Sequence, residues 1–241
     1  MTPLELSLLL SGAFVAGVVS AVAGFGGGIL YLPLVVALVG PREAVPLVTF
    51  GLMFSNITRV TIHWKSIVWP LATRYIMGAI PGAALGAVVF VKLPADWITK
   101  GIGAFLIASV VFLLVQKENR PPLTRWAIFY PLGAMVGFFS NMLGVVGPMA
   151  VPFFLATGIR KQAFVGTMAI GALLMHVTGV ATWSALKVIS TTTVTYGLLM
   201  GALMIVGTYA GNAMLKRFSS RVFMYVVQGL LVVIGVLFLV K

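Results

Sequence analysis

The sequence predicts an all-α, polytopic membrane protein with two inverted repeats, each with a broken or re-entrant first helix. Three observations lead to this prediction. Of the 241 residues, 61% are hydrophobic and only 8% are charged, with a mean hydropathy of +1.13, whereas a soluble domain carries about 25% charged residues. Long apolar segments recur along the chain, and its two halves resemble each other. The composition alone excludes a soluble enzyme.

Several apolar segments have the roughly 20 residues that a membrane-spanning helix needs. We expect such helices over 4–23, 44–63, 66–91, 96–116, 126–143, 162–186, 189–215 and 219–240. Two apolar segments, 29–39 and 148–158, are too short to cross the membrane. They follow the glycine-rich breaks at residues 24–28 (GFGGG) and 144–148 (GVVGP). The sequence therefore predicts about eight long helices and two short helical arms.

A polar segment at residues 116–122 divides the chain almost in half. The GVVS of residues 17–20 recurs as GFFS at residues 137–140, and the glycines of the two breaks align after it. An ordered series of matches indicates an internal duplication, which is common among secondary transporters. We expect a first transmembrane repeat at 1–116, a linker at 117–125 and a second transmembrane repeat at 126–241.

The 16 lysine and arginine residues bear on the orientation of the halves. If each glycine break were part of a straight crossing, the basic residues would divide evenly between the two sides. If each break turns the chain back as a hairpin, one side keeps Arg42, Lys92, Lys100, Lys187 and Lys241 and the other eleven fall opposite. The positive-inside rule favours the second arrangement. We therefore expect hairpins, inverted repeats and both termini outside.

The glycines have two interpretations. Those spaced four residues apart within 78–86 and 207–211 suit close helix packing. The break at 24–28 differs, because each of its four glycines costs about 1 kcal/mol of helix propensity. We expect it to unwind, and unwound backbone in a membrane needs protein or a watery cavity around it. The following arm would begin with free N–H groups and a positive dipole end, which suit an anion.

The candidate substrate-binding residues lie at the two breaks and in the second expected span. They are Ser20, Gly24, Gly26, Gly27, Gly28, Asn56, Arg59, Ser140, Asn141, Gly144, Gly147 and Pro148. Pro148 suits a first helical position, and the amide of Asn141 lies beside a broken helix. Arg59 leaves two alternatives: it is buried and pairs with a negative substrate, or it snorkels to the interface. His176 is a candidate proton carrier or a core histidine.

No aspartate or glutamate lies in the middle of an expected span, where cation pumps place carboxylates. A small anion therefore suits the site better than a cation. No P-loop motif is present, and an inside-negative potential favours anion export by about 2.3 kcal/mol per charge per 100 mV. Without cysteine, we expect no thiolate metal site, and we expect no cofactor. The net charge of +12 is explained by topology, with no nucleic-acid partner.

At residues 24–33 (GFGGGILYLP) the sequence resembles the TauE/SafE (sulfite exporter) family of membrane permeases. The resemblance covers nearly the whole chain, including the duplicated halves and the AFVGT of residues 163–167. By position, the family motif falls on Gly24, Gly26, Gly27, Gly28 and Pro33, and its second copy on Gly144, Gly147 and Pro152. The second copy departs from the glycine pattern at Val146 and Pro148. The resemblance implies transport of sulfite or small organosulfur anions across the bacterial inner membrane.

Together these inferences give the hypothesis of a secondary transporter, an exporter of a small sulfur-containing oxyanion such as sulfite or an organosulfonate. Alternating access would expose the anion, held at the broken-helix N-termini, to each side in turn. The alternative is a proton-coupled importer or a channel for another small anion. An enzyme is disfavoured because no nucleophile–base–acid set is visible. The expected partners are the anion and the lipid bilayer, and the sequence leaves homo-oligomer formation open.

Overall fold

The computed structural model describes residues 2–25, 27–115, 123, 125–144, 147–159 and 161–214. Within these residues the chain is helical and contains no strand. The α-helices are α1 (Pro3–Ala23), α2 (Gly27–Val39), α3 (Pro41–His63), α4 (Trp69–Lys92), α5 (Ala95–Val115), α6 (Phe129–Leu143), α7 (Gly147–Ala156), α8 (Lys161–Ala185) and α9 (Thr191–Met214). The expected span 219–240 and most of the linker 117–125 lie outside the described residues.

Six of the described segments are long and apolar enough to cross a membrane. They are Pro3–Ala23, Pro41–Ser66, Trp69–Lys92, Trp126–Leu143, Gln162–Ala185 and Thr191–Met214. The two short arms expected at 29–39 and 148–158 are α2 and α7, but α2 begins at Gly27, so Gly27 and Gly28 are helical and the unwound break is shorter than expected. The prediction of an all-α, polytopic membrane protein is confirmed.

The chain turns back on itself after α1. Gly24 ends α1 with a φ of +77°, a conformation that favours glycine, and its N–H donates to Ser20 O at 3.1 Å. The arm α2 then runs antiparallel to α1: Tyr31 OH donates to Leu9 O at 2.7 Å, and Gly12 lies against the Tyr31 ring. Residues 4–39 therefore form a hairpin rather than one kinked rod, as the charge distribution predicts.

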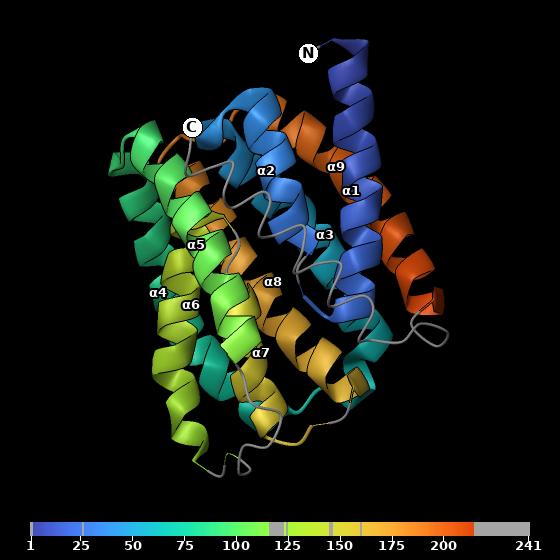
Figure 1. Ribbon diagram of the computed structural model, residues 1–241, viewed down its shortest axis with the longest axis vertical. Helices are drawn as coiled ribbons and strands as arrows, with labels where there is room; N and C mark the ends of the chain where they lie inside the picture. The colour runs from blue at the N-terminus through green and yellow to red at the C-terminus, as the bar shows by residue number, and fades with distance from the viewer. Residues whose placement is uncertain are drawn as a thin grey trace.

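A second turn of the same kind follows α6. Gly144 has a φ of +100°, its N–H donates to Ser140 O at 2.8 Å, and α7 begins at Gly147. In Figure 1, α1 descends from the N-terminal end of the molecule, whereas α6 rises from the opposite end. The two hairpins thus enter the bundle from opposite sides, and their turns approach each other in its interior.

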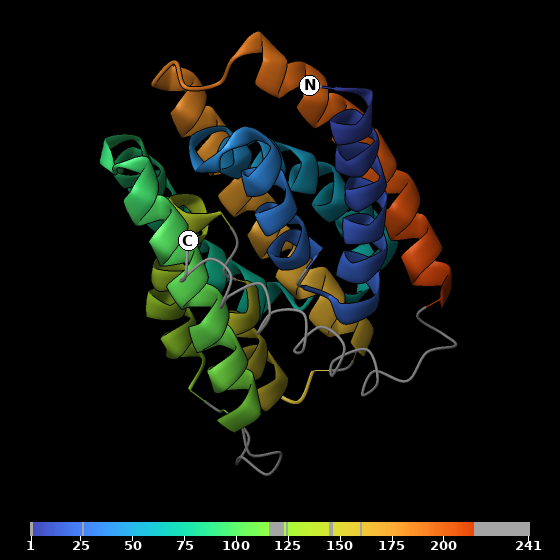
Figure 2. The ribbon, with the colours of Figure 1, turned by 45° about the horizontal axis from the view of Figure 1, so that its top comes forward.

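Helices of the two halves pack in a reciprocal pattern. The first helix of each half lies against the fourth helix of the other, as α1 on α9 and α6 on α4, while α3 and α8 pack together in the centre. Figures 1 and 2 both show α1 beside α9. Glycines allow these close approaches: a Cβ at Gly82 would overlap Ala134 O, and one at Gly207 would overlap Phe14 O. The close packing expected for these glycines is confirmed.

A Gly207→Leu variant is therefore expected to unfold at a lower temperature than the wild-type protein. Overfilling a packed site costs about 1–3 kcal/mol, and each kcal/mol shifts the melting temperature of a chain of this size by roughly 2–4 °C. The measurement is thermal unfolding of the purified protein in detergent. The matched control is Ala202→Leu, since Ala202 is exposed on the same helix. Equal melting temperatures for the two variants would contradict the close contact between α1 and α9.

Candidate functional site

A cavity of about 60 Å³ lies between the hairpin turns and helices α3, α4 and α8. One water molecule needs about 10–15 Å³ of such a cavity, so the cavity has room for several waters or one small ion. Residues that the sequence singles out form much of its lining: Ser20, Gly24, Gly28, Asn56, Arg59, Ser140, Gly147 and His176. The fold therefore brings together residues from both halves of the chain.

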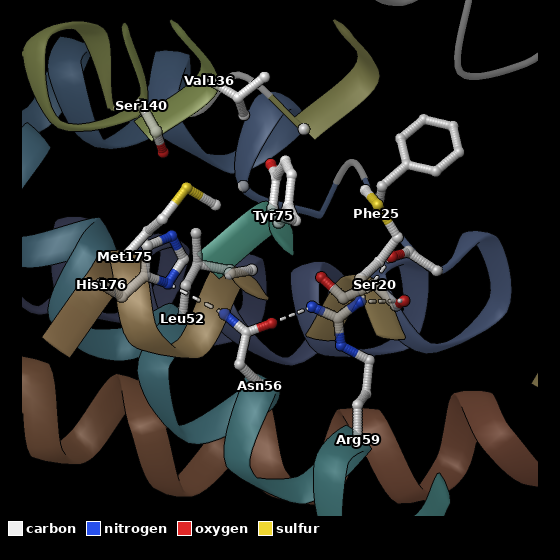
Figure 3. Close-up of a pocket in the computed structure, with 15 residues that line it drawn as sticks. Ser20, Phe25, Leu52, Asn56, Arg59, Tyr75, Val136, Ser140, Met175 and His176 are labelled. Carbon is white, nitrogen blue, oxygen red and sulfur yellow. Dashed lines mark hydrogen bonds between the residues drawn. The ribbon is translucent and has the colours of Figure 1, made fainter. Parts of the chain in front are cut away.

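Arg59 is the charged group of the cavity. It projects from α3 and is only 5% exposed, so it is buried and does not snorkel. Its Nη1 donates to Gly24 O at 2.7 Å and to Ser20 O at 3.3 Å, and its Nη2 donates to Asn56 Oδ1 (Figure 3). The guanidinium thus meets the carbonyl end of α1, where the helix dipole is negative. Arg59 Nε is buried and has no partner among the described residues.

Hydrogen bonds continue from Arg59 across the cavity wall. Asn56, one turn earlier on α3, faces His176 of α8, with 2.9 Å between Asn56 Nδ2 and His176 Nδ1. Asn56 is 1% exposed and His176 5% exposed. Figure 3 shows the three side chains as one row along the cavity. The row links the turn of the first hairpin to the central helix of the second half.

Two serine hydroxyls complete the polar lining, one from each half. Ser20 on α1 and Ser140 on α6 are buried and line the cavity. Other serines in this structure, such as Ser7 and Ser11, donate to a backbone carbonyl of their own helix. Neither Ser20 nor Ser140 does so, and neither hydroxyl bonds another group in the described part of the chain. Both hydroxyls are therefore available to a ligand in the cavity.

Other expected site residues lie outside the lining. Gly27 packs against Ala16 and Ser20, and Gly144 packs against Leu32 and Val45. Asn141 is fully buried. Its Nδ2 donates at 3.1 Å to both Ala83 O and Met175 O, which ties α6 to α4 and α8. Gly26 lies outside the described residues, as does the side chain of Pro148.

Asn141 also explains why the site is asymmetric. The offset that aligns residues 17–20 with residues 137–140 also aligns Arg59 of the first half with Gly179 of the second. A Cβ at Gly179 would lie 2.5 Å from Asn141 Nδ2, so Asn141 fills the space of any side chain there. Among the described lining residues, the second half therefore offers no counterpart of Arg59, and Arg59 is the one arginine or lysine of the lining.

Seven further residues line the cavity and were missed in the sequence. They are Phe25, Leu52, Tyr75, Val136, Met168, Ala172 and Met175. Leu52 and Val136 lie one turn before the predicted Asn56 and Ser140, so helical spacing could have found them. Tyr75 gives no such signal: it reaches the cavity from α4 because Gly171 of α8 leaves room for its ring, which is 2.7 Å from the position of a Cβ there.

The lining is positive and contains no carboxylate among its described residues. Glu43 and Asp96 lie in the first turns of α3 and α5, where both are exposed and neither lines the cavity. Among the described residues, no three His, Asp or Glu side chains gather as a metal site would need. An unpaired buried charge is unfavourable by several kcal/mol, so the cavity suits an anion that pairs with Arg59.

Comparisons with known proteins support a role in membrane transport. A family model described as Sulfite exporter TauE/SafE matches residues 9–238. The chain is also similar to the "Probable membrane transporter protein YjnA" of Bacillus subtilis (strain 168), with 26% identity over 262 residues that cover 96% of this chain and 98% of that protein. No solved structure gives a significant match.

Proposed function

The chain belongs to the Sulfite exporter TauE/SafE family and is a membrane transport protein, and we propose that it exports a small sulfur-containing oxyanion. Sulfite or an organosulfonate is the substrate class, and the bacterial inner membrane is the location. The observation that carries the proposal is the buried Arg59 in a cavity whose described lining has no carboxylate. A cation would be repelled there, whereas an oxyanion gains a charged partner and several hydrogen-bond donors.

The anion would bind where the first hairpin turns. Arg59 supplies the positive charge, and the hydroxyls of Ser20 and Ser140 supply hydrogen-bond donors. Gly28 lines the cavity and lies in the first turn of α2, whose N–H groups have no partner within the helix and form its positive dipole end. The sulfonyl or sulfite oxygens would accept these hydrogen bonds.

The transport cycle would be alternating access between two inverted repeats, 1–116 and 126–241. The hairpins α1–α2 and α6–α7 enter from opposite ends, so rocking one half against the other would open the cavity to each side in turn. The end of the bundle that carries Lys65, Arg74 and Arg125 would face the cytoplasm by the positive-inside rule. Its positive field would draw anions from that side.

The test is flux through proteoliposomes that contain the purified protein. Sulfite, sulfoacetate, thiosulfate and sulfate are loaded separately, and a potassium diffusion potential is imposed. We expect flux of sulfite or a sulfonate that follows the sign of the potential, because one charge gains about 2.3 kcal/mol per 100 mV. Flux of metal cations, or no flux of any of these anions, would refute the proposal. Flux that requires a proton gradient would favour the importer alternative.

A further inference from the structure

The polarity of the hydrogen bonds in the Arg59–Asn56–His176 row can be derived from one donor. A guanidinium donates and never accepts. Because Arg59 Nη2 bonds Asn56 Oδ1, the oxygen of the Asn56 carboxamide must face Arg59. The amide nitrogen then has only one direction left, toward His176. The side-chain flip of Asn56 is thus fixed by the network around it.

The same logic fixes the proton on His176. Asn56 Nδ2 lies 2.9 Å from His176 Nδ1 and is a donor, so Nδ1 must be the acceptor. A neutral imidazole with an accepting Nδ1 carries its proton on Nε2. A protonated ring would donate from both nitrogens, so its Nδ1–H would face the Asn56 amide hydrogen with no acceptor between them. Protonation would therefore break the row.

His176 Nε2 lies on the edge of the imidazole ring that faces the cavity. In Figure 3 this nitrogen lies on the edge opposite Asn56, on the side where the Ser140 hydroxyl is drawn. His176 lines the cavity, and Nε2 has no hydrogen bond to another described residue. The ring therefore presents one unused donor to whatever occupies the cavity.

We infer that His176 binds the transported anion as a neutral Nε2–H donor, held in this tautomer by Asn56, and does not gain or release a proton during transport. The inference rests on the proposed function of the cavity. Asn56 acts as a positioning residue toward His176, because one of its amide hydrogens orders the imidazole. Transport is then driven by the membrane potential, which acts on the charge of the anion. His176 contributes to recognition of the anion.

Few other titratable groups of the described part of the chain face His176. Arg59 and Tyr75 share the cavity lining. His63, one turn beyond Arg59 on α3, lies against Gly166 of α8. None of these groups is a carboxylate that would favour a second proton on the ring.

The direct test is ¹⁵N NMR of the histidine-labelled protein in nanodiscs at neutral pH. The chain has only two histidines, so a His63→Gln variant assigns the remaining signals to His176. We expect the pattern of a neutral ring with its proton on Nε2. A proton on Nδ1, or on both nitrogens, would overturn the inference. This readout needs no transport, so it can succeed even if the proposed substrate is wrong.

An Asn56→Asp variant is expected to reverse the direction of the hydrogen bond between residue 56 and His176. The carboxylate can only accept, so His176 should gain a proton at Nδ1 and its ¹⁵N pattern should change accordingly. A variant in which the pattern stays that of the wild type would show that Asn56 does not set the tautomer. A purely structural role of Asn56 would leave the tautomer unchanged, so the change in pattern is specific to the inferred role.

Two His176 variants test the binding role with sulfite as the probe. His176→Phe removes the donor, and we expect anion affinity to fall about tenfold to a hundredfold, the effect of losing one hydrogen bond to a charged group. His176→Gln offers an acceptor to Asn56 and a donor to the anion, so it should restore most of the affinity and the flux. Restored binding without flux in His176→Gln would overturn the inference, because it would assign a proton-carrying step to His176.

Discussion

An Arg59→Met variant is expected to lose anion binding and transport. The guanidinium is buried, and it is the charge that the cavity offers among its described residues. Removing one partner of a buried ion pair costs about 3–5 kcal/mol, because the other charge is left uncompensated. The affinity for the transported anion should therefore fall at least a hundredfold. Equilibrium binding to the purified protein and flux in proteoliposomes both measure the loss.

Arg42 provides a matched control. It donates to Leu93 O at 2.7 Å and to Val91 O at 3.5 Å, beside the carbonyl end of α4, much as Arg59 meets the carbonyl end of α1. It is exposed and far from the cavity lining. Arg42→Met should therefore retain wild-type affinity. If both variants lose transport equally while remaining folded, Arg59 acts by capping a helix and the anion binds elsewhere.

A Gly27→Leu variant is expected to abolish transport while the protein still inserts into the membrane. A Cβ at this position would overlap both Ala16 O and Ser20 Oγ, so the arms of the first hairpin could not pack. Overfilling costs about 1–3 kcal/mol, and the displaced Ser20 lines the cavity. Proteoliposome flux, together with the amount of protein in the membrane fraction, measures the outcome.

A Gly147→Ala variant tests whether any side chain at the first residue of a short arm, α2 or α7, is harmful. Gly147 begins α7 as Gly27 begins α2. However, the nearest neighbour of a Cβ at Gly147 is Phe25 Cβ at 3.6 Å, an ordinary contact. Gly147→Ala should therefore keep the wild-type melting temperature. Full flux in Gly27→Leu would contradict the hairpin packing on which the site depends.

The hairpins could be predicted because local chemistry determines them. Clustered glycines disfavour helix, and the distribution of basic residues favours a reversal over a straight crossing. The structure places positive φ angles at Gly24 and Gly144, within these two breaks. The short arms and the long helices follow from segment length, which needs no tertiary information.

The environment of Arg59 could not be predicted, because it depends on where another helix ends. Arg59 lies four residues before the end of α3, a position from which a long side chain can reach either the interface or the interior. It is buried because the turn at Gly24 brings two carbonyls within reach. The contact of Asn141 with Gly179 likewise depends on the distance between two packed helices, which no local sequence pattern encodes.

The proposed site can be tested directly, because it requires an anion in the cavity beside Arg59. Selenite can replace sulfite, and its selenium atom can be located by anomalous scattering from crystals soaked in it. We expect a selenium peak in the cavity, within hydrogen-bonding distance of Arg59 and absent from Arg59→Met crystals. Selenite bound only at other sites, with water filling the cavity, would contradict it.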